Sequence, residues 1–214
     1  MSFDRVAPHY RRLETLIFGR QLQMARCAFV RQSARPRRAL VVGEGNGRFL
    51  EQLRRAQPDL QVDCLDASVR MLELARARVG DPCVQFVQAD IREAAFPAKR
   101  YDLIVTHFFL DCFEEAALRP LVEKLSAAAT DEATWLIADF HAPPRGWRRW
   151  WGRLLIATMY FFFRVAAGIK ARRLEEYAPL LRAQDFALTK EVISPNGMIR
   201  SQQWERPGRH PGKS

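Results

Sequence analysis

Three glycines, Gly43, Gly45 and Gly47, follow the short apolar run 39–42 and precede a stretch with apolar residues at helical spacing. Glycine has no Cβ and tolerates positive φ, so the backbone of such a turn can lie directly against a ligand. The helix that follows would point its first N–H groups at an anion. Because position 48 is Arg, the spacing is GxGxG, not the GxGxxG of nicotinamide-binding folds, and no Walker lysine follows.

Two aspartates end the next two apolar runs. Asp66 closes the run 61–66, 19 residues after Gly47, where a carboxylate can accept hydrogen bonds from both hydroxyls of a ribose. Asp90 closes the run 84–90 and can accept from the amino group of an adenine. Each aspartate alone could be a helix cap, but their positions at successive strand ends favour an adenosine-containing ligand.

Candidate proton-transfer groups follow the fourth and fifth apolar runs. His107 and His141, two of the four histidines, lie at these ends, and either could act as a base near neutral pH. Asp111 could orient a histidine or cap the helix after it. The alternative for each histidine is a structural ring hydrogen-bonded to the backbone. The four cysteines form no CxxC pair and no histidine stands at zinc spacing, so no metal site is expected.

These residues need a parallel sheet to bring them to one edge. Continuous apolar runs alternate with helical patterns, which predicts a doubly wound, mostly parallel α/β sheet with helices on both faces. Ser68 is placed to cap the helix 69–79. An antiparallel hairpin around Pro195-Asn-Gly completes seven strands. The predicted strands are 39–42, 61–66, 84–90, 101–107, 134–140, 186–193 and 198–204.

The sequence predicts a single domain over residues 1–205, in which further segments accompany the sheet. Residues 1–35 form an N-terminal helical segment, and residues 206–214 read as a disordered tail. The aromatic and basic segment 143–181 forms cover helices. One apolar helical face runs along 147–165, which is either a core helix or a lid over an apolar substrate.

The formal net charge of +10 indicates an anionic binding partner or reflects a general preference for arginine in the composition. No apolar run approaches the roughly 20 residues of a membrane span, and Met1–Arg5 does not begin a signal peptide. Scattered cysteines fit reduced thiols, so a cytoplasmic location is expected. The basic segment 147–173 predicts peripheral contact with anionic lipid at the inner membrane surface.

Four stretches together resemble class I methyltransferases that depend on S-adenosylmethionine. They are Val42-Gly-Glu-Gly-Asn-Gly-Arg-Phe, Leu65-Asp-Ala-Ser-Val-Arg-Met-Leu-Glu-Leu-Ala, Ala89-Asp90 and Tyr101-Asp-Leu-Ile-Val, within residues 36–140. The opening Phe3-Asp-Arg-Val-Ala-Pro-His-Tyr is similar, over a shorter stretch, to the ubiquinone/menaquinone C-methyltransferase branch.

This resemblance implies a Rossmann-like methyltransferase fold and S-adenosyl-L-methionine as cofactor. It places the glycine turn at the methionine part, Asp66 and Ala67 at the ribose, and Asp90 and Ile91 at the adenine, with His107 nearby. The family usually has an acid two positions before the first glycine, where this chain has Val41. Glu44, inside the turn, is the candidate to replace that acid.

The predicted reaction is methyl transfer to an O or C atom of a small, largely apolar molecule. A nucleic-acid (RNA) methyltransferase is the first alternative, although the Asn/Asp-Pro-Pro-aromatic motif is replaced by His107-Phe-Phe-Leu and Pro82-Cys83 precedes the third strand. The second alternative is a non-catalytic membrane-surface protein that retains the fold. The sequence predicts no particular oligomeric state.

Overall fold

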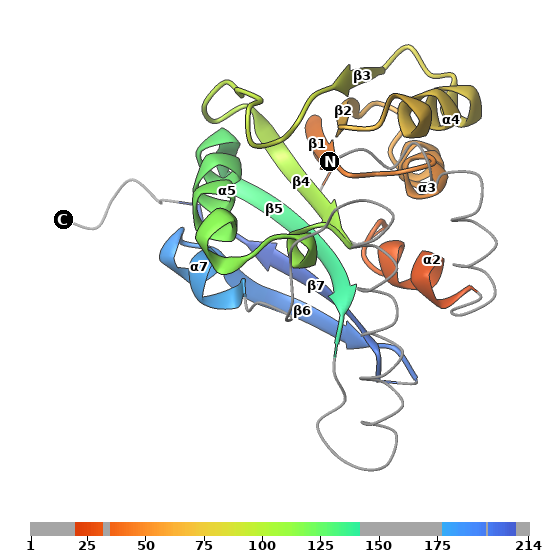
Figure 1. The fold of residues 1–214 in the computed structure, drawn as a ribbon. Coiled ribbons are helices and arrows are strands. Elements are labelled where there is room, and N and C mark those ends of the chain that lie inside the picture. Colours follow the sequence, from red (N-terminus) through yellow and green to blue (C-terminus); the bar gives the residue numbers. More distant parts are fainter. Residues whose placement is uncertain (1–19, 32–34, 142–176, 196, 209–214) are drawn as a thin grey trace.

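The computed structural model describes residues 20–31, 35–141, 177–195 and 197–208. They form a seven-stranded sheet of order β3-β2-β1-β4-β5-β7-β6 (Figure 1). Strands β1 to β5 pair in parallel, and β7 runs antiparallel between β5 and β6. This confirms the predicted sheet and hairpin. The strands are β1 Arg38–Val42, β2 Gln61–Asp66, β3 Val84–Gln88, β4 Tyr101–His107, β5 Ala129–Phe140, β6 Ala187–Ile193 and β7 Ile199–Glu205.

Helices cover both faces of the sheet, as the alternating pattern predicts. Helices α5 and α7 lie on one face, while α2, α3 and α4 lie on the other (Figure 1). The helices are α2 Gln21–Arg26, α3 Arg48–Ala56, α4 Val69–Val79, the short 3₁₀ helix η1 Leu110–Cys112, α5 Glu115–Ala128 and α7 Ala178–Ala183. Of the helices that the structure describes, none combines the length and apolar character needed to cross a bilayer.

Two hydrophobic clusters explain why the central strands are continuously apolar. On β1, Leu40 and Val42 point into the cluster under α5, whereas Ala39 and Val41 point into the cluster under α3. Successive side chains of a strand face opposite sides, so a strand covered on both faces needs apolar residues at every position. The same alternation decides on which face each polar residue at a strand end lies.

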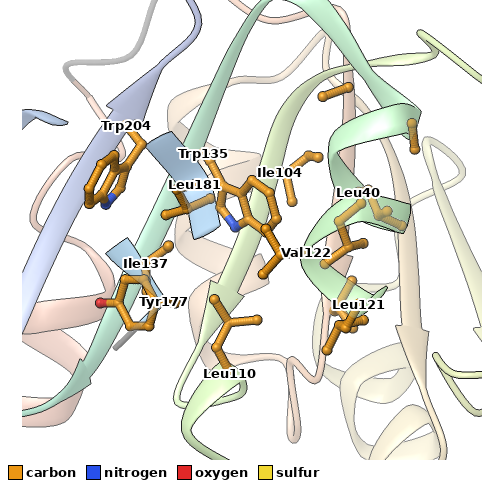
Figure 2. Packing of buried hydrophobic residues seen from close by; sticks show 14 of the residues in the cluster. Leu40, Ile104, Leu110, Leu121, Val122, Trp135, Ile137, Tyr177, Leu181 and Trp204 are labelled. Carbon is orange, nitrogen blue, oxygen red and sulfur yellow. The ribbon is translucent and has the colours of Figure 1, made fainter. Parts of the chain in front are cut away.

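The cluster under α5 and α7 is built around two tryptophans (Figure 2). Trp135 of β5 and Trp204 of β7 are fully buried and pair across the strands. The Trp135 indole N–H donates to Thr106 Oγ1 of β4 at 2.8 Å, and Leu181 of α7 packs beside them. This packing fixes the three strands whose ends reach the candidate site.

The predicted bounds of β1, β6 and β7 are each shifted by one residue, and three larger differences have a structural reason. β5 begins at Ala129, not at residue 134, because Ala129 pairs with Tyr101 and the register shifts before Leu103. β3 ends at Gln88, so Asp90 lies in the following turn. Arg206 belongs to the folded domain, not to the tail, since its N–H donates to the Ala133 carbonyl at 3.0 Å.

The Arg206 side chain explains why the folded domain extends this far. Its guanidinium donates to the Gln184 and Thr130 carbonyls, each at 3.1 Å, and lies 4.5 Å from the ring centre of Phe186. Three predicted features lie outside the described residues. They are segment 1–19 of the N-terminal helices, the core or lid helix 147–165, and the lipid contact expected of 147–173.

Candidate functional site

The three glycines of the turn all have positive φ, of 68°, 73° and 80°, but for different reasons. A Cβ on Gly43 would lie 2.3 Å from Cδ2 of Phe109, and a Cβ on Gly47 would lie 2.7 Å from Cα of Ala75 in α4. A Cβ on Gly45 would meet no atom within 4 Å. Gly43 and Gly47 therefore permit close packing within the protein, whereas Gly45 borders open space that a ligand can enter.

Glu44 caps the helix that follows the turn. Its Oε1 accepts from the N–H groups of Phe49 and Leu50, each at 3.0 Å. These groups are among the first donors of α3, which have no partner inside the helix. The Glu44 carboxyl thus occupies the helix N-terminus, where a dinucleotide-binding fold would place a ligand's pyrophosphate. Burial raises the pKa of Glu44 to about 7, although the two N–H groups and Arg26 lower it.

Replacing Glu44 with glutamine should remove a pH dependence of stability. A carboxyl whose folded pKa is raised contributes stability at low pH that is lost as the pH rises toward about 7. The glutamine side chain would keep an oxygen for the two N–H groups but carry no charge. Between about pH 5 and about pH 8, wild type should lose on the order of 1–3 kcal/mol more unfolding free energy than Glu44→Gln. Urea unfolding at both pH values measures this difference, and equal pH dependence would contradict it.

Asp66 is held at the end of β2, beside the glycine turn. Its Oδ1 accepts from the Ser68 N–H at 2.9 Å, and its Oδ2 accepts from the Gly45 N–H at 3.3 Å. The side chain is buried, and Ala67 beside it is partly exposed. Each oxygen of a carboxylate can accept more than one hydrogen bond, so this orientation leaves capacity for the hydroxyls of a ligand.

The turn after β3 carries the other predicted adenosine contacts. Arg92 forms a two-pronged ion pair with Asp90, with its Nε donating to Oδ1 at 2.9 Å and its Nη2 donating to Oδ2. This pairing holds the pKa of Asp90 well below its usual range. An adenine amino group would therefore share Asp90 with Arg92. The Ile91 side chain lies in the cluster under α5, and its carbonyl accepts from Lys124 Nζ at 3.1 Å.

His107 ends β4 on the face covered by α2 and α3. Its ring packs edge-on against Phe49, with ring centres 4.6 Å apart. Neither ring nitrogen forms a hydrogen bond of normal geometry, although the Arg26 backbone lies near the ring. Burial, with a smaller effect of the Arg26 charge, lowers the pKa of His107 to about 3. The ring is consequently neutral at physiological pH.

Two phenylalanines follow His107 and border the glycine turn. Phe108 has φ of 52°, a conformation that is unfavourable for a residue other than glycine and that is typical of functional sites. Its ring lies 4.9 Å from that of Phe140 and 5.1 Å from the Arg26 guanidinium. Phe109 packs against Gly43. The end of β4 therefore presents apolar rings beside the turn.

Acidic groups lie on the opposite face of the sheet from His107. Asp139 follows Trp135 and Ile137 at alternate positions of β5, which places it on the face covered by α5. Asp139 and Asp111 are buried and interact electrostatically. His141 is partly exposed, and burial together with Arg200 lowers its pKa. Sequence reasoning named Asp111 and His141 but gave no role to Asp139 or Arg200.

Comparisons with known proteins agree with this geometry. A family model described as a methyltransferase domain matches residues 39–131. A malonyl-[acyl-carrier protein] O-methyltransferase of Acetivibrio thermocellus is 27% identical over 154 residues, or 72% of this chain and 48% of that protein. A demethylmenaquinone methyltransferase of Thermotoga maritima is 30% identical over 108 residues, or 50% of this chain and 46% of that protein.

Methyltransferases are also found among the solved structures whose fold resembles that of this chain. A SAM-dependent methyltransferase from Aquifex aeolicus superposes with a TM-score of 0.64 at 14% identity, covering 94% of this chain and 98% of that chain. The chain spans less than half the length of the two curated relatives. The family model and the fold agree: residues 39–131 match a methyltransferase domain, and the fold is the one seen in S-adenosylmethionine-dependent methyltransferases of solved structure.

Proposed function

We propose that this chain is an enzyme that transfers a methyl group from S-adenosyl-L-methionine to an O or C atom of a small, largely apolar molecule. The observation that carries the proposal is the open backbone at Gly45 beside the fixed carboxylate of Asp66. The Glu44 carboxyl already occupies the free N–H groups at the N-terminus of α3, which favours a cofactor without phosphates over a dinucleotide.

The residues of the site suit this cofactor in three places. Asp66 would accept from the ribose hydroxyls, the Gly45 backbone would border the methionine part, and the turn at Asp90 would border the adenine. When bound, the cofactor supplies a methyl group on a positively charged sulfur to an in-line nucleophile. The protein's contribution is then chiefly to hold the acceptor in line and to exclude water.

An apolar acceptor fits the surroundings of the turn. The rings of Phe108 and Phe140 pack together at the ends of β4 and β5, and the Phe109 ring packs on Gly43 of the turn. The relatives named above are named for a malonyl group on an acyl carrier protein and for demethylmenaquinone, neither of which is a nucleic acid. Both observations support a small-molecule acceptor.

His107 is poorly suited to be the base of this reaction. A base with a pKa of about 3 has little drive to take a proton near neutral pH, and its ring packs against Phe49. We expect His107→Asn to lower turnover by less than about tenfold, where loss of a working base costs about 10²–10⁴-fold. Initial rates with a labelled methyl donor measure this. A loss of more than a hundredfold in a folded variant would restore His107 as the base.

A labelling experiment separates the proposal from its two alternatives. The purified chain is incubated with S-adenosylmethionine carrying a labelled methyl group and with a cell lysate, after which lipids, nucleic acids and proteins are separated. We expect label in the organic extract, and clearly less of it with an Asp66→Ala variant when the methyl donor is limiting. Label in the nucleic-acid fraction would support the alternative of a nucleic-acid methyltransferase, which the net charge of +10 suggests. Cofactor binding without transfer to any fraction would indicate a non-catalytic protein.

A further inference from the structure

A polar cluster lies at the ends of β5 and β7, on the face covered by α5 and α7. Asp139 and Arg200 stand directly opposite each other in the antiparallel pairing of these strands. The Arg200 guanidinium lies 5.9 Å from the ring centre of Tyr177, whose hydroxyl donates to Gln202 Oε1 at 3.1 Å. Figure 2 shows Tyr177 on this face, near Ile137 and Trp204.

Within the part of the chain that the structure describes, this cluster leaves hydrogen-bonding atoms unsatisfied. Asp139 is only 2% exposed, and neither Oδ1 nor Oδ2 forms a hydrogen bond of normal geometry, although the N–H groups of Phe108 and Phe109 lie near the carboxyl. The buried Nε of Arg200 forms none either, since its nearest carboxylate oxygen, on Glu191, is 4.0 Å away. Buried polar groups are normally paired, because an unpaired one costs free energy. Arg200 also interacts with Glu191 and Tyr177, but its Nε–H and the Asp139 carboxyl both lack hydrogen bonds of normal geometry at opposed positions. A ligand atom that accepts from both would satisfy them.

The surrounding charges determine what kind of atom fits. Burial and then the Asp111 carboxyl raise the pKa of Asp139 well above its usual range, whereas Arg200 and the N–H groups of Phe108 and Phe109 lower it. Asp139 is therefore protonated, and able to donate, at higher pH than an ordinary aspartate. The other titratable groups that interact with the cluster are Cys112, His141, Tyr177 and Glu191.

The cluster lies close to the turn assigned to the cofactor. The N–H groups of Phe108 and Phe109 lie near the Asp139 carboxyl, and the Phe109 ring packs on Gly43. In the sheet order, β4 separates Asp139 on β5 from β1 and the glycine turn, and Arg200 lies one strand farther, on β7. An acceptor bound at Asp139 and Arg200 would therefore lie beside the end of β4.

We infer that Arg200 and Asp139 form an oxyanion-binding subsite, which holds the negatively charged oxygen of the acceptor: a phenolate, an enolate or a carboxylate. The Arg200 Nε–H and the Asp139 O–H would both donate to this oxygen, as charge-assisted hydrogen bonds require. The acceptor's proton goes to water before transfer, so no protein group has to retain it. This inference rests on the proposed function, whose reaction needs an electron-rich acceptor.

The test uses two small probes with the full chain saturated by S-adenosylhomocysteine. 4-Nitrophenol reports by its absorbance whether it is bound as the phenolate, and benzoate tests a carboxylate. The matched control for Arg200→Gln is Arg182→Gln, because Arg182 lies 5.7 Å from the ring centre of Trp204 but is exposed. Asp139→Ala removes the second donor, whereas Asp139→Asn keeps one. Thermal melts establish that each variant folds.

We expect wild type to bind at least one probe, with 4-nitrophenol held as the phenolate. Arg200→Gln should weaken probe binding by at least about tenfold, and Arg182→Gln by less than about twofold. Asp139→Ala should also weaken it by about tenfold, while Asp139→Asn stays within about threefold of wild type. Binding of benzoate alone would identify the carboxylate as the acceptor oxygen.

Two results would overturn the inference: no binding of either probe to wild type, or equal effects of the two arginine substitutions. Failure of the proposed function gives a different result. In that case wild type would not bind S-adenosylhomocysteine, whereas probe binding to the chain alone would still respond to Arg200→Gln.

Discussion

Replacing Asp66 with alanine should weaken the binding of S-adenosylmethionine by at least about tenfold, and by about a hundredfold if both ribose contacts are desolvated. The carboxylate would accept from two hydroxyls, and hydrogen bonds to charged groups contribute about 1.5–3 kcal/mol each. Its orientation is already fixed by the N–H groups of Gly45 and Ser68. Isothermal titration calorimetry of wild type and variant measures the change.

Asp63 provides the matched control on the same strand. Asp63 lies three residues before Asp66 on β2, and its Oδ2 accepts from the Tyr101 hydroxyl at 2.8 Å. Asp63→Ala should lower the stability of the protein but leave cofactor affinity within about twofold, because the lost hydrogen bond and the lost ion pairs with Arg38 and Arg100 are all structural. Equal losses of affinity in the two variants would mean that Asp66 acts through the fold and does not contact the cofactor.

The second large effect is expected on the free energy of unfolding when a glycine of the turn is replaced. Gly47→Ala should lower the free energy of unfolding by about 2–5 kcal/mol, since alanine would meet the backbone of Ala75 at 2.7 Å and adopt a φ of 80°. Gly45→Ala has a similar φ but open space around the new methyl group, so its cost should be about 1–2 kcal/mol. Denaturant unfolding compares the two.

Cofactor binding should rank the same two variants in the opposite order. The methyl group added at position 45 would enter the space proposed for the cofactor, so Gly45→Ala should lower affinity by about tenfold or more in a folded protein. Gly47→Ala, measured at a temperature where it is folded, should bind more tightly than Gly45→Ala. If Gly45→Ala binds as wild type does, the open space beside Gly45 is not the cofactor site.

The fold could be predicted from local pattern because each central strand is covered on both faces. Continuous apolar runs then mark the strands, and the strand ends mark the edge where Asp66 lies. Ser68 was likewise predictable as a cap, and its Oγ accepts from the Met71 N–H at 3.2 Å. The early start of β5 was not, because Thr130, Asp131 and Glu132 interrupt the apolar pattern that marks the strand.

The roles of individual site residues depended on contacts that sequence spacing does not contain. Glu44 stands within the glycine turn, but only the path of the backbone shows its Oε1 at the end of α3. His107 and Asp139 both lie at strand ends, yet they point to opposite faces of the sheet. Arg200 comes from the closing hairpin, and only the register of β7 against β5 brings it opposite Asp139.

The most direct test of the account is a pair of calorimetric titrations of the wild-type chain, one with S-adenosylhomocysteine and one with NADH. We expect saturable one-to-one binding of S-adenosylhomocysteine, weakened by Asp66→Ala. We expect no binding of NADH, because the Glu44 carboxyl already occupies the N–H groups of α3 where a pyrophosphate would bind. Binding of NADH with no binding of S-adenosylhomocysteine would contradict it.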